Sequence, residues 1–195
     1  LIAVGVFMIC FASVREKVQK KESEHYSFRE MFKLLGTNKP LILLSLGFVF
    51  YHISTTIRMT AALYYFEYNM GKAELVPVFM GVLIIATLMG TVVTLPLSKK
   101  FGKRNIYLGG ALISIIANMM FYFISYDNIA MIFILASISV LSFSATLLCH
   151  WSMLPDTVEY GEWKTGKRGE GITYGLNMFV QKLGGSIAGG LSGLI

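Results

Sequence analysis

The stretch VPVFMGVLIIATLMGTVVTLPLS, residues 76–98, decides the fold class of this chain. It holds no charged side chain, and the basic pair Lys99-Lys100 follows it directly. About 20 consecutive apolar residues are enough for a helix to cross the hydrocarbon core of a bilayer. The stretch therefore predicts a transmembrane helix that ends at a charged membrane surface.

Comparable apolar runs lie on both sides of this one. Over the whole chain, hydrophobic residues make up 55% and charged residues 14%, and the mean hydropathy is +0.64. A soluble domain has roughly 25% charged residues, so an all-α polytopic membrane protein is predicted. Because the chain begins and stops inside apolar runs, without a signal-peptide pattern, we expect a fragment of a longer protein. The further runs are about 1–14, 40–68, 105–125, 129–154 and 171–195.

The basic residues predict how the chain is oriented. Of the 17 Lys and Arg, 14 lie in the three segments 15–39, 99–104 and 155–170. The opposite connections hold only Lys72 among the basic residues. By the positive-inside rule, the three basic segments are cytoplasmic loops of an inner-membrane protein. The net charge of +6 is explained by this alternation and indicates no nucleic-acid partner.

One connection is much longer than the others and suggests two bundles. Residues 1–14 are interpreted as the end of the last helix of an N-terminal bundle, and 15–39 as a cytoplasmic linker. Within the linker, the amphipathic stretch from Ser27 to Leu35 predicts an interfacial helix. Residues 40–195 are interpreted as a C-terminal bundle, whose first helix starts at Pro40 because proline is well tolerated in a first helical turn.

Polar residues within the spans recur at helical spacing. For such stripes two interpretations stay open: hydrogen bonds between helices, each worth about 0.6 kcal/mol, or a wall of a water-filled cavity. The stripes are Thr87, Thr91 and Thr94; Ser114, Asn118, Tyr122 and Ser125; and Tyr174, Asn177, Gln181 and Gly185. Close helix approach or sliding is expected from the G-x-x-x-G spacings among Gly184, Gly185, Gly189, Gly190 and Gly193.

Lys182 is the charged residue that the membrane accommodates least easily. It lies about 16 Å along the last span from Gly171, close to the midplane. An unpaired ammonium at that depth costs about 2.5–3.5 kcal/mol or more. We therefore expect a partner for Lys182, which is a substrate, water, or an acid in a half of the protein outside this chain. Lys182, with Tyr174, Asn177 and Gln181, is a candidate substrate-binding residue.

Arg58 and two histidines also lie within spans. Arg58 falls toward the outer side of the second span, so that substrate binding and interfacial anchoring by snorkelling both stay open. His52 and His150 are expected to be structural histidines that make hydrogen bonds. Neither they nor Cys10 and Cys149 have the spacing of a metal site.

The segment 155–170 is the richest in charge. Asp156, Glu159 and Glu162 are spaced by three and would share one helical face, and basic residues follow them. Such charges can pair to close a cytoplasmic gate and separate when it opens. The candidate gate residues are Asp156, Glu159, Tyr160, Glu162, Lys164, Arg168 and Glu170.

The run D-T-V-E-Y-G-E-W-K-T-G-K-R-G-E-G-I-T-Y-G at 156–175, followed by Lys182, resembles the glycoside–pentoside–hexuronide:cation symporter family, to which the melibiose permeases belong. The segment A-L-Y-Y-F-E-Y at 62–68 and the basic linker add to this resemblance. It implies a major facilitator-type helical bundle, of which this chain covers roughly helices six to eleven of twelve. Because Leu147 stands where those permeases have a sugar-site tryptophan, melibiose is not implied as the substrate.

The resemblance also implies a function. It implies cation-coupled symport of a sugar, glycoside or hexuronide by alternating access, with Lys182 as the family's eleventh-helix lysine. The coupling cation, Na⁺ or H⁺, would bind in the N-terminal half, and no other cofactor is implied. The implied partners are a small sugar, membrane lipid and that missing half.

Two other classes of function fit the sequence less well than transport does. A membrane enzyme would need a catalytic constellation, and the sequence offers no nucleophile with a nearby base and no metal-ligand spacing. A membrane scaffold would not need Lys182 in a span or acids in register. Transport is therefore favoured over both.

Overall fold

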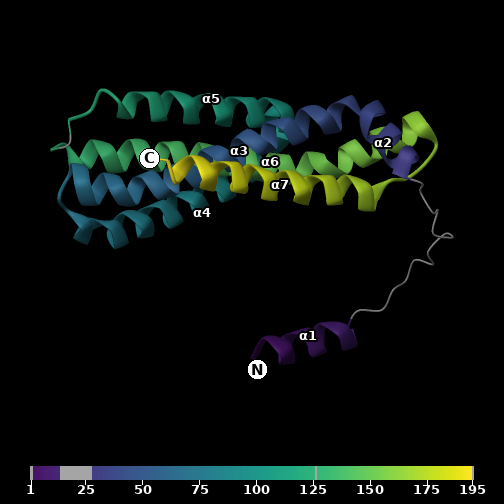
Figure 1. Cartoon of the computed structure of the whole chain (residues 1–195), viewed down its shortest axis with the longest axis horizontal. Helices are drawn as coiled ribbons and strands as arrows, with labels where there is room; N and C mark the ends of the chain where they lie inside the picture. The colour runs from purple at the N-terminus through teal and green to yellow at the C-terminus, as the bar shows by residue number, and fades with distance from the viewer. Residues whose placement is uncertain (1, 14–27, 126, 195) are drawn as a thin grey trace.

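The computed structural model describes residues 2–13, 28–125 and 127–194, and these are helical with short connections. Figure 1 shows the helices α3 to α7 running alongside one another as a bundle. The elements are α1 (Ile2–Ser13), α2 (Phe28–Thr37), α3 (Lys39–Tyr64) with a π-helical turn (Tyr65–Asn69), a 3₁₀ turn (Ala73–Leu75), α4 (Val76–Phe101), α5 (Lys103–Phe121), α6 (Ile129–Thr165) and α7 (Glu170–Ser192). The all-α fold class is confirmed.

Three helical segments of the described chain are long and apolar enough to cross a membrane. They are Lys39–Asn69, Ala73–Phe101 and Ile129–Thr165. The helices α5 and α7 lie beside them, α5 mainly against α6 and α7 mainly against α3. A multi-pass membrane location follows from this arrangement.

Local capping explains where several helices begin and end. Asn38 accepts a hydrogen bond from the Leu41 backbone N–H at 3.1 Å and so caps α3, with Pro40 in the first turn. Asn128 caps α6 in the same way through the Met131 N–H at 3.2 Å. Gly102 has φ of 83° and reverses the chain between α4 and α5, a conformation that other residues adopt only at a cost.

Glycines allow helices to approach closely at a few positions. A Cβ at Gly110 on α5 would lie 2.6 Å from the Ser142 carbonyl oxygen of α6. A Cβ at Gly184 on α7 would lie 2.9 Å from the Val49 carbonyl oxygen of α3. By contrast, a Cβ at Gly185 or Gly189 would have no atom of another described helix within 4 Å. Of the glycine pattern predicted in the last span, Gly184 is the one that permits close packing within this bundle.

The predicted loop 155–170 is mostly helix, which corrects the sequence-based boundaries. The helix α6 continues to Thr165 and contains 37 residues, which is about 55 Å of helix. A hydrocarbon core is only about 30 Å thick, so α6 extends well beyond it. The sequence becomes polar after Pro155, which is why a loop was predicted there. A helix needs only its own backbone hydrogen bonds, however, so α6 can continue with charged side chains exposed. Likewise, of the predicted loop 99–104 only Gly102 is not helical.

A helix, α2 (Phe28–Thr37), is present where the sequence predicts an interfacial helix. Its Leu34 side chain is 5% exposed and packs against Gly169, the residue before α7. The first part of the predicted linker, residues 15–27, lies outside the described residues, and with it the basic residues Arg15, Lys17, Lys20 and Lys21.

The threonine stripe on α4 forms hydrogen bonds inside its own helix. Thr87 donates to the Leu83 carbonyl at 2.8 Å, and Thr94 donates to the Gly90 carbonyl at 2.6 Å. Thr91 donates to the Thr87 carbonyl at 3.0 Å. Each hydroxyl is thus satisfied four residues back. Within the described residues these hydroxyls make no hydrogen bond to another helix, which was one of the two interpretations of this stripe.

Candidate functional site

Arg58 is the centre of a polar cluster inside the bundle. Its Nη1 donates a hydrogen bond to Ser139 Oγ on α6 at 3.2 Å. The guanidinium carbon also lies 4.9 Å from the centroid of the Phe143 ring. The Nε atom is buried and has no hydrogen-bond partner among the described residues. The side chain therefore turns toward α6 rather than out to the membrane surface, which argues against the anchoring interpretation.

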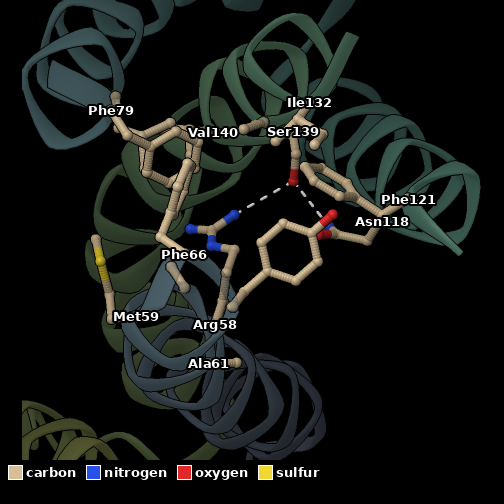
Figure 2. Close-up of a pocket in the computed structure, with 14 residues that line it drawn as sticks. Arg58, Met59, Ala61, Phe66, Phe79, Asn118, Phe121, Ile132, Ser139 and Val140 are labelled. Atoms are coloured by element: carbon tan, nitrogen blue, oxygen red, sulfur yellow. Dashed lines mark hydrogen bonds between the residues drawn. The ribbon is translucent and has the colours of Figure 1, made fainter. Parts of the chain in front are cut away.

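Ser139 joins three helices at one hydroxyl group. It is fully buried, and it also accepts from Asn118 Nδ2 on α5 at 2.8 Å. Ser114 Oγ lies 3.0 Å away. A hydroxyl oxygen has two lone pairs, and the donors of Arg58 and Asn118 occupy both. The Ser139 proton is then directed to Ser114. Figure 2 shows Arg58 and Asn118 converging on Ser139.

Two cavities lie against Arg58. One has a volume of about 200 Å³ and is lined by Arg58, Asn118 and Ser139 on its polar side, with Phe66 and Phe79 among its apolar walls. We call it the inner cavity. The other has a volume of about 350 Å³ and lies between α3, α4 and α6. We call it the outer cavity; its lining includes Tyr51, Thr55, Arg58, Thr87, Phe143 and Leu147.

The residues predicted on α7 do not form one wall. Asn177 is fully buried, and its Oδ1 lies 2.8 Å from His150 Nε2 on α6. Tyr174, Gln181 and Lys182 are exposed. Successive residues of a helix are separated by about 100°, so Lys182 points about 140° away from Asn177. Asn177 therefore packs into the bundle and faces away from Lys182, and a direct role of Asn177 in substrate binding stays a prediction.

Lys182 makes no hydrogen bond or ion pair with the described part of this chain, and its side chain is exposed. This agrees with the expectation that its partner lies outside the chain. The structure thus separates the two intramembrane cations: Arg58 is covered by this bundle, and Lys182 lies on its surface.

The two histidines lie close together around Phe48. His150 stacks on Phe48 with 3.8 Å between ring centroids, and His52 meets the same ring edge-on at 4.4 Å. His150 is a hydrogen-bonded structural histidine, as predicted. One ring nitrogen of each histidine, Nδ1 of His150 and Nε2 of His52, is buried and has no hydrogen-bond partner among the described residues.

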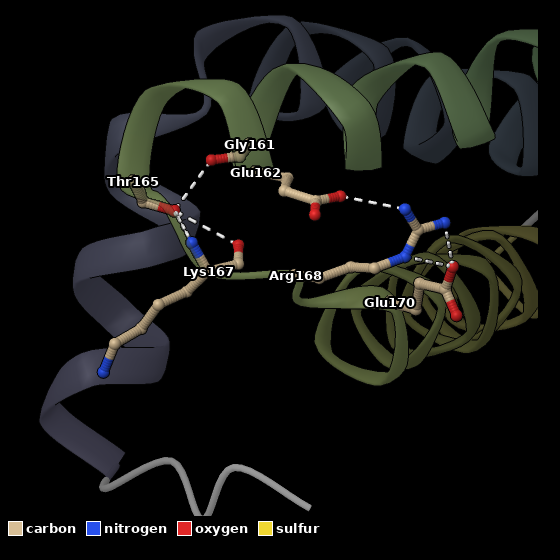
Figure 3. A network of polar contacts seen from close by, with 6 residues as sticks. All are labelled: Gly161, Glu162, Thr165, Lys167, Arg168 and Glu170. Carbon is tan, nitrogen blue, oxygen red and sulfur yellow. Dashed lines mark hydrogen bonds and ion pairs between the residues drawn. The ribbon is translucent and has the colours of Figure 1, made fainter. Parts of the chain in front are cut away.

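The cytoplasmic acids pair with different bases. Lys103, the first residue of α5, donates to Asp156 Oδ2 at 2.7 Å and to the Ser152 carbonyl at 3.0 Å. Arg168 bonds to Glu162 at 2.9 Å and to Glu170 at 2.5 Å, as Figure 3 shows. These carboxylates, Glu170 first, raise the pKa of Arg168 above its ordinary value, so Arg168 stays charged at every physiological pH.

The remaining predicted gate residues lie around the end of α6. Lys164 Nζ donates to the Thr37 carbonyl of α2 at 3.1 Å and lies 5.7 Å from the Tyr160 ring. Glu159 is exposed and forms no ion pair within the described residues. The three acids predicted in register thus have separate environments, because Asp156 reaches α5, Glu162 reaches the start of α7, and Glu159 reaches neither.

Sequence reasoning missed the residues that connect these groups. It did not identify Ser139 and Phe143, which contact Arg58, or Lys103, which forms an ion pair with Asp156. A signal was present in α6, where Ser139, Ser142 and Thr146 recur at helical spacing and all three are buried.

A family model for MFS/sugar transport proteins matches residues 1–195. The chain belongs to this family. The curated relatives of this chain are named as symporters, carriers, transporters, importers or exporters and not as enzymes. An uncharacterised symporter of Bacillus subtilis is 33% identical over 98% of this chain. A glucuronide carrier protein homologue of Escherichia coli is 31% identical over 97%, and an isoprimeverose transporter of Lactiplantibacillus pentosus is 34% identical over 100%.

The chain spans only about 42% of the length of these relatives. The bundle described above therefore corresponds to less than half of the length of these relatives. The suspected resemblance to sugar symporters is confirmed at the level of the family.

Proposed function

We propose that this chain forms most of the C-terminal half of a secondary active transporter, which carries a sugar, glycoside or hexuronide across the inner membrane in symport with Na⁺ or H⁺. The observation that carries the proposal is the polar wall at Arg58, Asn118 and Ser139 inside a bundle of membrane-length helices. Polar and charged groups in such helices mark solute pathways far more often than lipid contacts. The names of the relatives support a sugar as the solute.

The substrate would bind between this bundle and the missing half of the protein, where transporters of this architecture place their sites. The outer cavity, with Arg58, and the exposed face of α7, with Tyr174, Gln181 and Lys182, would contribute the groups of this half. Asn177 would act indirectly, because it holds α7 against α6 through His150.

The cytoplasmic pairs would set the geometry of the gate. The Lys103–Asp156 pair ties the start of α5 to α6, and Arg168 ties Glu162 of α6 to Glu170 of α7. Since the ends of three helices are joined, they would move together when access alternates. The exposed Glu159 is then available to meet the other half. The coupling cation would bind outside this chain.

Counterflow of labelled sugars tests the proposal. The whole protein would be reconstituted in proteoliposomes and loaded with a panel of pentosides, hexosides and hexuronides, under imposed Na⁺ or pH gradients. We expect saturable flux of one class, dependent on one of the two gradients. A correctly inserted protein that moves none of these sugars would contradict transport and favour a scaffold role.

A further inference from the structure

We propose that the inner cavity is a binding site of its own, which takes a small aromatic molecule with one hydroxyl group, a phenol, and not a sugar. This site lies beside the outer cavity, which the proposed transport function uses, and shares Arg58 with it. Its walls, its polar side and its volume together select the ligand.

Helices of this chain form the walls of the inner cavity. The lining comes from α3 with its π-helical turn and from α4, α5 and α6. The walls include Ala62, Phe66, Phe79, Phe121 and Ala136. Because these residues all lie in the described bundle, the site is built without a contribution from the half of the protein outside this chain.

Aromatic rings make up much of the apolar side. Phe66 and Phe79 both line the cavity, with 4.8 Å between their ring centroids. Phe133 packs against this pair, with its ring 5.2 Å from that of Phe79 and inclined by 80°. Aromatic rings attract one another in tilted or edge-on arrangements at centroid separations of about 4.5–7 Å. A ligand ring in the cavity would extend this cluster in the same way, which favours an aromatic ligand.

The polar side of the cavity suits a single hydroxyl group. Arg58 and Asn118 lie there, and Figure 2 shows both directed at Ser139. The bond from Nη1 to Ser139 holds the guanidinium in place and uses one N–H group, and a guanidinium carries several more. A phenolic oxygen can accept a hydrogen bond from one of these, and the positive charge also attracts the face of the aromatic ring.

The volume fits one aromatic ring. The inner cavity measures about 200 Å³, and an apolar protein cavity of about 150 Å³ is large enough to bind benzene. A pyranose carries hydroxyl groups around its ring, and each buried hydroxyl without a hydrogen-bond partner is costly. Since most of the lining is apolar or aromatic, the cavity accommodates a phenol better than a sugar.

Fluorine NMR of 4-fluorophenol tests the proposal on the whole protein in phosphatidylcholine nanodiscs. The probe also enters lipid, so each titration of the wild type would be compared with one of Ala136→Phe in the same nanodiscs. Ala136 is buried and lines the inner cavity, and a ring at this position would take the place of the ligand. We expect saturable broadening of the probe signal with the wild type, and binding weaker by about tenfold or more in Ala136→Phe, because a filled cavity has no space for a further ring.

Matched variants separate filling of the cavity from effects on the fold. Ala130→Leu adds a side chain at an exposed position of α6 and should leave binding unchanged. Ala62→Leu fills the cavity from α3 and provides a second readout if Ala136→Phe does not insert. Fluorobenzene lacks the hydroxyl group, and the wild type should bind it about tenfold more weakly than 4-fluorophenol, since a hydrogen bond to a charged group is lost. Arg58→Met should remove this difference between the two probes.

Two outcomes would overturn the proposal. Equal binding of 4-fluorophenol by the wild type and Ala136→Phe would mean that the probe binds lipid or another surface. Equal affinities of the wild type for 4-fluorophenol and fluorobenzene would contradict the role of Arg58 and, with it, a phenol as the ligand. Neither measurement requires transport, so the counterflow of sugars can succeed or fail independently of this site.

Discussion

Asn38 bonds to two helices at once and thereby ties the start of α3 to the cytoplasmic part of α6 at Thr157. Its Oδ1 caps α3, and its Nδ2 donates to the Thr157 carbonyl at 2.7 Å. The side chain is almost fully buried. With the Lys164–Thr37 bond beside it, this contact makes the α6 extension part of the folded bundle, and the predictions below follow from such links.

Replacing Asn38 by alanine should destabilise the protein. The change leaves the Leu41 N–H and the Thr157 carbonyl without their partner, and loss of a cap alone costs about 1 kcal/mol. We expect a lower melting temperature of the purified protein in detergent. A matched change, Asn105→Ala, removes an exposed amide that donates to the Phe101 carbonyl at the nearby end of α4 and should have a smaller effect. Equal melting temperatures would argue against the double role of Asn38.

Asp156→Asn should slow transport more than it weakens binding. The Lys103–Asp156 pair is 42% and 54% exposed, and an exposed ion pair contributes only about 0–1 kcal/mol to stability. Its effect is therefore expected on the movement of helix ends. Equilibrium binding and counterflow rates would be compared, and Lys103→Gln should match Asp156→Asn. An equal loss of affinity and rate would contradict the gate assignment, and Arg168→Ala gives an independent check.

Lys182→Ala should abolish flux without lowering stability. The side chain is exposed and makes no hydrogen bond or ion pair within the described residues, so its removal should cost this bundle little. Counterflow and thermal melting would be measured on the same preparation. Unchanged flux would remove Lys182 from the substrate site.

Asn177→Ala should act on stability instead of affinity. It leaves a fully buried histidine without its hydrogen bond, which costs about 1–3 kcal/mol. Thermal melting and equilibrium sugar binding distinguish the two effects, with the exposed neighbour Met178→Ala as the control. A large loss of affinity at unchanged melting temperature would return Asn177 to the substrate site.

Gly184→Leu should separate α7 from α3. A side chain there meets the Val49 backbone, and overpacking typically costs about 1–3 kcal/mol. Gly185→Leu enters space that this chain leaves open and should be tolerated by the bundle. If both variants melt alike, the close approach at Gly184 is not important for stability.

The linear sequence determined the membrane class, the orientation and most helix centres. Apolar runs such as 76–98 are set by composition, because lipid accepts only long helices with satisfied backbones. Basic segments set the orientation, and the charged run at 156–175 was specific enough to indicate the family. The membrane class, the orientation and the family can all be inferred without knowing which helices pack against each other.

Only the tertiary structure decided which side chains contact one another. Arg58 could have anchored at the interface, and only the approach of α6 showed that it reaches Ser139 and Phe143. Asn177 and Lys182 are five residues apart, yet packing against α3 and α6 buries one and exposes the other. The continuation of α6 to Thr165 was hidden for the same reason: a helix outside the membrane is stabilised by contacts such as Asn38–Thr157, which join residues 119 positions apart and leave no local pattern.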